Sequence, residues 1–490
     1  MRWMTKAGIG VAAVIGVVAA AVAVRTVTYR PPGVSDGAAV DLAPAVAVDL
    51  EGAAQHLAEA VRIRTVSHQD PTGNDWAEWE RLRAWLSDTY PSLHSVASLE
   101  LVAGHTLLYT WAGSDPSLPP IVLLAHHDVV PVTPGTEGDW THPPFAGVVA
   151  DGAVWGRGSI DDKSSLIGLF EAADALAASG FHPRRTVLIV SGHDEEAGGS
   201  GAAAAAQLLQ SRGVRPEFVL DEGLAVIADY PLLGRPVALV GIAEKGYGTL
   251  EVTAPAKGGH SSAPPPQTGV ETLARAVLAI TGKPFPMAFD GPAAAMLRAL
   301  APEADTLVRM AVANEWLFEP LLVRQLAATP AGAAMLHTTI APTMLRGSPK
   351  ENVLPQDAAA WINYRIAPGT TSAEVIERAR SATDGLDVKV DWMHPPYEAP
   401  PVSSATSRGY RIIAALASDD GRTPVAPGLV TATTDSRSFA GIAEDIYRFQ
   451  PIVASIREFE MIHGTDEHLT LENLQRLTDF YARLIATAAR

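Results

Sequence analysis

Histidines and carboxylates follow several short apolar runs in this 490-residue chain. The first run, 121–125, ends in His126, His127 and Asp128. Successive side chains on a strand alternate between faces, so His126 and Asp128 point one way and His127 the other. A histidine with a carboxylate two residues later is the pattern of a metal ligand beside the group that orients it. The same triplet is common without a metal, so this cluster needs support from others.

A glycine-rich turn at 156–160 leads to Asp161 and Asp162, just before a predicted helix. Both carboxylates could bind a metal there. The alternative is a helix N-cap, in which an Asp side chain satisfies free amide groups at the helix start. That alternative suits Asp162 better than Asp161.

Three further clusters complete the set, two after predicted strands and one near the carboxyl terminus: Glu195 and Glu196, Asp221 and Glu222, His463 and His468. Two adjacent glutamates after a buried strand repel each other and lose hydration unless a cation or proton compensates. Since Glu195 and Glu196 point in different directions, one can bind a metal while the other takes a proton from metal-activated water. A solvated acidic loop is the alternative.

The five clusters together offer two histidines, at least three carboxylates and a spare glutamate. Oxygen and imidazole ligands suit Zn(II), Mn(II) or Co(II), and two metals bridged by one carboxylate need about this many groups. The chain has no cysteine, so it has no disulfide, thiolate nucleophile or thiolate metal site. A net charge of −17 argues against a nucleic-acid partner. No P-loop, dinucleotide-binding glycine pattern or Ser-His-Asp arrangement competes.

Strands and helices alternate from about residue 50, and this order predicts how the clusters are positioned. The predicted helices are 51–62, 75–87, 164–178 and 201–210, and the predicted strands are 106–110, 121–125, 186–191 and 218–220. Such alternation predicts an α/β fold with a mostly parallel sheet flanked by helices. Open sheets of this kind bind ligands at the carboxyl ends of their strands, so we expect the clusters to meet there.

The amino terminus carries a targeting signal. Arg2 and Lys6 precede an uncharged run, 7–24, which is short for a membrane span and long for a signal-peptide core. We favour an uncleaved signal anchor over 1–25, with the catalytic domain outside the cytoplasm. A cleaved signal peptide and a secreted protein are the alternative. Residues 26–48, rich in Pro, Gly and Ala, are typical of a stalk.

Six motifs in this order resemble the dizinc metallopeptidase family that includes aminoacylase, carboxypeptidase G and carboxypeptidase S. They are H-x-D (126–128), G-R-G-x-x-D-D-K (156–163), H-D-E-E (193–196), L-D-E-G (220–223), G-G-H-S-S (258–262) and I-H-G (462–464). The resemblance extends from about residue 50 to the end. Segments 313–322, 351–369 and 433–439 resemble the carboxypeptidase S branch, which contains the N-fatty-acyl-amino-acid synthase/hydrolase.

The resemblance implies a catalytic dizinc domain over 49–245 and 394–490, with an inserted α+β lid domain over 246–393. One zinc would be held by His126, Asp161 and Asp221, and the other by Asp161, Glu196 and His463. Asp161 would bridge the two ions, for which Co or Mn could substitute. Relatives use either the residue equivalent to Asp221 or its neighbour, and we choose Asp221 over Glu222.

The resemblance also assigns roles around the metals. Asp128 would orient His126, and Glu195 would be the general base that removes a proton from zinc-activated water and passes it to the leaving nitrogen. His260, in a lid loop, would donate a hydrogen bond to the developing oxyanion. An exposed turn histidine is the alternative.

Two lid residues, Asn352 and Arg365, would clamp a substrate carboxylate, which arginine does bidentately. An edge-strand ion pair is the alternative for Arg365. The lid also carries an extra apolar helical segment, 285–335. Its leucines, Trp316 and Phe318 would pack in the lid core or in a subunit contact. The sharper alternative is an apolar channel for an acyl chain.

These expectations describe a metal-dependent amide hydrolase. Its small-molecule substrate would be an N-acyl amino acid, or a short peptide that loses its C-terminal residue. The alternative is a non-catalytic binding or scaffold protein with the same fold, but every expected ligand and the base are present. Relatives often form homodimers through the lid, a surface that the extra segment can block or replace.

Overall fold

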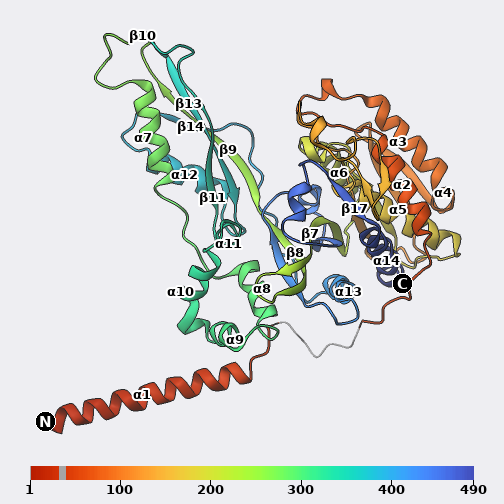
Figure 1. Cartoon of the computed structure of the whole chain (residues 1–490), viewed down its shortest axis with the longest axis horizontal. Coiled ribbons are helices and arrows are strands. Elements are labelled where there is room, and N and C mark those ends of the chain that lie inside the picture. The colour runs from red at the N-terminus through yellow and green to blue at the C-terminus, as the bar shows by residue number, and fades with distance from the viewer. Residues whose placement is uncertain (1, 33–39) are drawn as a thin grey trace.

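The computed structural model describes residues 2–32 and 40–490, with side chains from residue 13 onward. Figure 1 shows a large α/β body, an elongated lid beside it, and the helix α1 (Arg2–Val27) projecting from the base. The large body is built from chain segments on both sides of the lid, because the strands on either side of the insertion pair in one sheet.

An eight-stranded sheet forms the centre of the large body, in the order β1-β2-β6-β3-β7-β16-β8-β15. Its strands are β1 (Ala97–Val102), β2 (Thr106–Trp111), β3 (Ile121–Leu124), β6 (Val187–Ser191), β7 (Phe218–Tyr230), β8 (Arg235–Glu244), β15 (Val425–Val430) and β16 (Asp445–Ala454). The pairs β6–β3, β3–β7, β7–β16 and β8–β15 run parallel. The expected α/β fold with a mostly parallel sheet is confirmed.

Helices cover both faces of this sheet. They are α2 (Leu50–Arg62), α3 (Trp76–Thr89), α4 (Pro91–Val96), α5 (Lys163–Ala178), α6 (Ser200–Ser211), α13 (Arg408–Ala417) and α14 (Leu471–Ala488). Strand β3 shows the two layers. Ile121 and Leu123 face the core under α2, α5 and α14, whereas Val122 and Leu124 face the core under α6. A strand buried on both faces reads as the unbroken apolar run seen in the sequence.

A small sheet of β17 (His468–Thr470), β5 (Ala153–Trp155) and β4 (Val148–Ala150) joins the two ends of the catalytic chain. His468 pairs with Trp155 in the β17–β5 register. This pairing brings the loop before β17 beside the turn after β5, so two distant motifs become neighbours.

The lid is a four-stranded antiparallel sheet in the order β11-β13-β9-β14, covered on one face by α7 and α12. Its elements are β9 (Gly246–Pro255), α7 (Gly269–Thr281), β11 (Thr339–Arg346), β13 (Asp357–Ile366), α12 (Ser372–Ala382) and β14 (Lys389–Trp392). A short pair, β10 (Gly259–His260) and β12 (Val353–Leu354), forms its far end (Figure 1).

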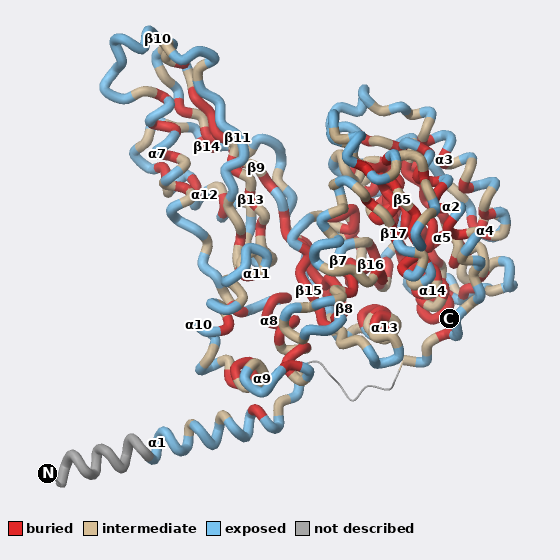
Figure 2. Tube along the Cα trace, in the orientation of Figure 1, coloured by how far each residue is buried: buried red, intermediate tan, exposed pale blue. Residues whose placement is uncertain are grey.

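The extra helical segment forms α8 (Gly291–Leu300), α9 (Thr306–Ala313), α10 (Glu315–Leu326) and α11 (Pro330–Ala334). Leu297 and Leu300 pack with Val237 of β8 and Ala426 of β15, at the edge of the large sheet. Trp316 is 58% exposed, so it does not pack in the lid core. Figure 2 shows that much of α10 is exposed. This helical segment belongs to the inserted region but packs against the edge of the catalytic sheet.

The carboxyl end of α1 contacts this helical segment. Arg25 Nε donates to the Ala313 carbonyl at 3.0 Å, and Asn314 Nδ2 donates to Thr26 Oγ1 at 3.3 Å. Among the described residues, no helix has the length and apolar character required to span a membrane. The predicted anchor at 1–25 and stalk at 26–48 lie partly outside this description, which omits residue 1, the side chains of 2–12, and 33–39.

Candidate metal centre

Asp161 lies between two histidines from opposite ends of the catalytic chain. Its Oδ1 is 2.9 Å from His126 Nε2, and its Oδ2 is 3.1 Å from His463 Nε2. His463 Nε2 is also 3.1 Å from Glu196 Oε2. One carboxylate with an oxygen toward each imidazole is the arrangement expected of a bridge between two cations.

The fold positions these side chains at one edge of the large sheet. His126 follows β3, Glu196 follows β6 in the short helix η3 (Glu195–Ala197), and Asp161 lies just before α5. His463 lies in the loop before β17, with a left-handed backbone φ of 61°. His126 and Glu196 thus follow two parallel strands, and Asp161 and His463 reach the same place from loops.

Strand β7 turns Glu222, and not Asp221, toward this centre. Glu222 Oε1 is 3.3 Å from His126 Nε2. The Asp221 carboxylate instead accepts hydrogen bonds from the backbone N–H groups of Glu222, at 3.0 Å, and Ser436, at 2.8 Å. Neighbouring side chains on a strand point to opposite faces, so only one of the two can face His126. The geometry places Glu222 where we expected Asp221.

Asp128 holds the loop that carries both glutamates. Its Oδ1 accepts from the Glu195 N–H and its Oδ2 from the Glu196 N–H, each at 3.1 Å. Ser67 Oγ donates to the same Oδ2 at 2.6 Å. His126 Nδ1 is 3.4 Å from Asp128 Oδ1 and 3.0 Å from the Asp128 carbonyl. Asp128 thus contacts His126 as expected, and it also fixes the backbone of Glu195.

Glu195 and Glu222 resist ionisation when no cation is present. For Asp161, burial is outweighed by hydrogen bonds to His126 and His463, which lower its pKa. Burial, reinforced by the charge of Asp161, raises the pKa of Glu222 to about 8. Burial also raises the pKa of Glu195 well above its usual value, against the opposing effect of His126. Hydrogen bonds to Asp161 and Glu196 raise the pKa of His463 to about 10. The buried carboxylates of Glu195 and Glu222 therefore require a compensating positive charge before they ionise.

The donor atoms fit divalent cations in chemistry and spacing. Ligand atoms of His126, Asp161 and Glu196 lie within 4.8 Å of one another, and so do those of His126, Asp162 and Glu222. Zinc bonds of 2.0–2.2 Å place tetrahedral ligand atoms about 3.3 Å apart, and the contacts here are 2.9–3.3 Å. All donors are oxygen or imidazole, which suits zinc.

Two neighbouring residues, His127 and Asp162, make other contacts, although Asp162 also lies near His126 and Glu222. His127 points away, as the strand alternation predicts, and its Nδ1 is 2.7 Å from Ser191 Oγ. Burial lowers the pKa of His127 to about 3, so it is a neutral core histidine. Asp162 occupies the N-cap position of α5, but its side chain makes no cap hydrogen bond. Its Oδ1 accepts from Gln450 Nε2 at 3.1 Å.

The three predicted lid residues lie apart from this centre. His260 is exposed on β10, at the far end of the lid, where Ser262 N–H donates to its Nδ1 at 3.1 Å. The carbonyl of Asn352 accepts from the Ser261 N–H nearby. Arg365 lies over the Tyr247 ring, with its guanidinium carbon 4.9 Å from the ring centroid. In the described part of the chain, none of the three hydrogen-bonds to a proposed metal ligand.

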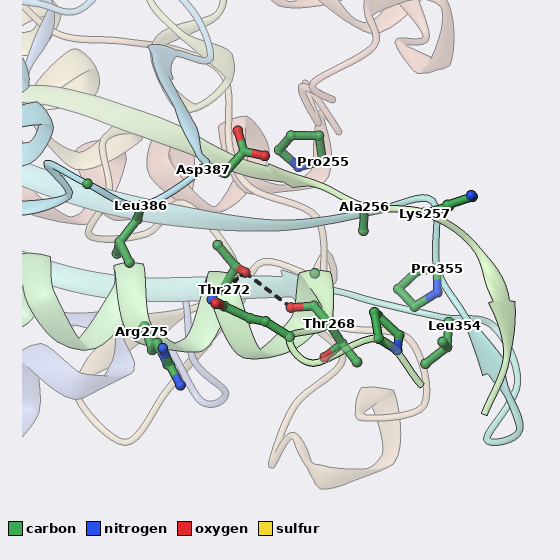
Figure 3. A pocket seen from close by; sticks show the side chains of 14 residues that line it. Pro255, Ala256, Lys257, Thr268, Thr272, Arg275, Leu354, Pro355, Leu386 and Asp387 are labelled. Carbon is green, nitrogen blue, oxygen red and sulfur yellow. Dashed lines mark hydrogen bonds between the residues drawn. The ribbon is translucent and has the colours of Figure 1, made fainter. Parts of the chain in front are cut away.

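Two cavities could hold a substrate, one beside the metal centre and one in the lid. One of about 620 Å³ opens at Glu196 and is lined by the loop around His68 and by Val130 and Pro131. A larger one of about 720 Å³ lies in the lid, between α7 and the loops around Leu354 and Leu386 (Figure 3). The cavity beside Glu196 is the one next to the reactive groups, so it is the better candidate for substrate.

Comparisons with known proteins agree with this geometry. The sequence profile of Peptidase family M20/M25/M40 matches residues 122–487. The chain belongs to this family. Probable carboxypeptidase S-like 2 of Dictyostelium discoideum is 36% identical over 439 residues, covering 88% of this chain and 84% of that protein. The N-fatty-acyl-amino acid synthase/hydrolase PM20D1 of Xenopus tropicalis is 38% identical over 434 residues, covering 87% and 84%.

The fold has a counterpart among solved M20 structures. The M20 family metallo-carboxypeptidase Sso-CP2 of Sulfolobus solfataricus has a TM-score of 0.65 at 17% identity, covering 89% of this chain and 98% of that one. The resemblance to the carboxypeptidase S branch is confirmed, and this M20 chain is an enzyme of a metal-dependent hydrolase family.

Proposed function

We propose that this M20 enzyme uses two zinc ions to hydrolyse the amide bond of N-acyl amino acids or of the C-terminal residue of small peptides. The placement of Asp161 between His126 and His463 carries the proposal. The names of the relatives, carboxypeptidase S-like and N-fatty-acyl-amino acid synthase/hydrolase, support the substrate class.

His126, Asp161 and Glu222 would hold one ion, and Asp161, Glu196 and His463 the other. This set replaces Asp221 with Glu222, because only Glu222 faces His126. When bound, zinc lowers the pKa of a coordinated water to about 7 and polarises a carbonyl oxygen.

Glu195 is the proposed general base. Its backbone N–H donates to Asp128 at 3.1 Å, and the charges of His126 and Glu222 act on its buried carboxyl group, which supports a position near the proposed ligands. The Glu195 carboxylate takes a proton from the attacking water and later gives it to the leaving nitrogen. A C–O bond forms first, the C–N bond then breaks as the nitrogen accepts the proton, and the products are a carboxylic acid and a free amine.

His260 is proposed to donate to the developing oxyanion, with Asn352 and Arg365 binding the substrate carboxylate. Since His260 lies at the far end of the lid, it can act only after that end approaches the metals (Figure 1). The approach requires lid closure within one chain or a lid from a second copy in a homodimer. Mixing His260→Ala with Glu195→Gln, two variants expected to be inactive, separates these routes.

We also propose that the enzyme acts outside the cytoplasm, anchored or released through residues 1–25. The support is the uncharged run 7–24, which is flanked by Arg2, Lys6 and Arg25. Fractionation of cells that express the full chain tests this point. Recovery of the enzyme in the cytosol would rule it out.

The catalytic proposal is tested with the purified full chain. Metal analysis should give two zinc ions per chain, and a panel of N-acyl amino acids and dipeptides should be hydrolysed in a chelator-sensitive manner. Glu195→Gln should lower kcat by about 10²–10⁴-fold with zinc content unchanged. A zinc-loaded protein that hydrolyses none of the panel, or a Glu195→Gln variant with full activity, would contradict the proposal.

A further inference from the structure

Glu467 is a fully buried carboxylate that binds the backbone around the bridging ligand. Its Oε1 accepts from the N–H groups of Gly158 at 3.0 Å, Ile160 at 2.9 Å and Asp161 at 3.2 Å. Three converging donors on one carboxylate oxygen leave the 158–161 turn little freedom. The orientation of Asp161 therefore depends on a residue from the opposite end of the chain.

Arg157 completes this arrangement from the other side. Its Nη1 pairs with Glu467 Oε2, and both side chains are at most 2% exposed. Its Nη2 donates at 2.8 Å to the carbonyl of Gly464, the residue after His463. The Gly156 N–H also donates to the Glu467 carbonyl at 2.8 Å. The pair thus ties the turn that carries Asp161 to the loop that carries His463.

The His463 loop needs such support. His463 has a left-handed φ of 61°, a conformation that costs a non-glycine residue free energy unless its surroundings impose it. Its side chain is half exposed, so packing alone does not fix it. Arg157 on Gly464 supplies a fixed point one residue away, at the spacing needed for His463 to reach Asp161 and Glu196.

We propose that Arg157 and Glu467 are positioning residues that set the spacing of Asp161 and His463, and hence the affinity of the ion on the His463 side. The inference rests on the proposed two-metal function. Neither side chain is among the ligand groups, so both act through the ligands. Removing such a supporting contact typically weakens metal binding by 10–100-fold.

The test is a zinc titration of the full chain against a competing chelator, which resolves two binding steps. His463→Ala identifies the step that belongs to the His463 side. Glu467→Gln keeps the volume but places an amide NH2 against either the backbone donors or Arg157, so it should weaken that step by about 10–100-fold. The other step should weaken less, because the ion on the His126 side shares Asp161 but not His463.

Glu217→Gln is the matched control, since Glu217 pairs with Arg185 at 2.7 Å beside the amino end of β7, opposite the metal edge. It should leave both steps unchanged. Circular dichroism checks that each variant is folded. Should Glu467→Gln fail to fold, Arg157→Lys decides, because lysine keeps the charge but has one nitrogen for two partners, and the same step should weaken.

Unchanged zinc affinities in folded Glu467→Gln, or in Arg157→Lys where it decides, would overturn the inference. So would equal weakening of both steps. A wild-type chain that binds no zinc would instead overturn the proposed function, and the inference with it, so the two failures are distinguishable.

Discussion

Removing the metals should make the folded protein less stable as the pH rises. Burial raises the pKa of Glu222 from 4.5 to about 8, whereas the unfolded chain restores the lower value. Between these values the folded state binds more protons than the unfolded state, so the free energy of unfolding falls with increasing pH. The stability is complete below about pH 4.5 and is lost as the pH passes through about 8.

The size of the effect follows from the same values. A rise of the Glu222 pKa from 4.5 to about 8 corresponds to about 5 kcal/mol, since one pKa unit is worth about 1.4 kcal/mol. This value is an upper limit, because neighbouring carboxylates titrate together and protonation of one favours ionisation of the next. Bound zinc reverses the dependence, since it binds the ionised carboxylates and binds less well when they are protonated.

Urea unfolding of chelator-treated and zinc-loaded protein between pH 5 and pH 8 measures the effect, with tryptophan fluorescence as the signal. The metal-free protein should lose several kcal/mol of unfolding free energy over this range. Glu222→Gln should remove much of the pH dependence. Glu377→Gln, at an exposed position on α12, should leave it unchanged. A metal-free protein that is as stable at pH 8 as at pH 5 would refute the reasoning.

Two further predictions concern the assignment of residues. Glu222→Gln should lose zinc, whereas Asp221→Asn should keep both ions, and metal analysis of the two purified variants distinguishes them; the reverse pattern would restore Asp221 as the ligand. His260→Ala should lower kcat by about 10²–10³-fold while keeping its zinc, because His260 lies away from the ligands. Activity recovered on mixing His260→Ala with Glu195→Gln would show that a second copy supplies the histidine, and no recovery would favour closure within one chain.

The helices and strands of the catalytic domain were predictable where a local sequence pattern specifies each one. The unbroken apolar run at 121–124 gave the buried strand β3, and α5 and α6 begin within one residue of their predicted starts. The strands β8, β15 and β16 were not predicted. Their order depends on which strand pairs with which across long stretches of sequence, and local periodicity carries no such information.

The types of the ligand residues were also predictable, but which neighbouring side chain points toward the centre was not. His126 and His127 separate as strand alternation requires, because the backbone stays extended beyond β3, where the His127 N–H donates to the Gly192 carbonyl. For Asp221 and Glu222, the alternation rule does not say which of the two side chains faces His126. Strand β7 also continues past Gly223, whose φ is 141°. Arg157 and Glu467 were missed because their role exists only where two distant loops meet.

No sequence motif specifies the position of the lid. The contact between Tyr247 and Tyr397 lies where the chain enters and leaves the lid. A side chain at Gly246 would collide with the Tyr397 backbone, and Tyr247 and Tyr397 exchange backbone hydrogen bonds of 2.9 and 2.8 Å. Tyr397 also lies under Arg437, whose Nη2 donates at 2.7 Å to Gly198, next to η3. A lid motion that displaces Tyr397 would therefore also disturb Arg437 and its contact to the loop that carries Glu195.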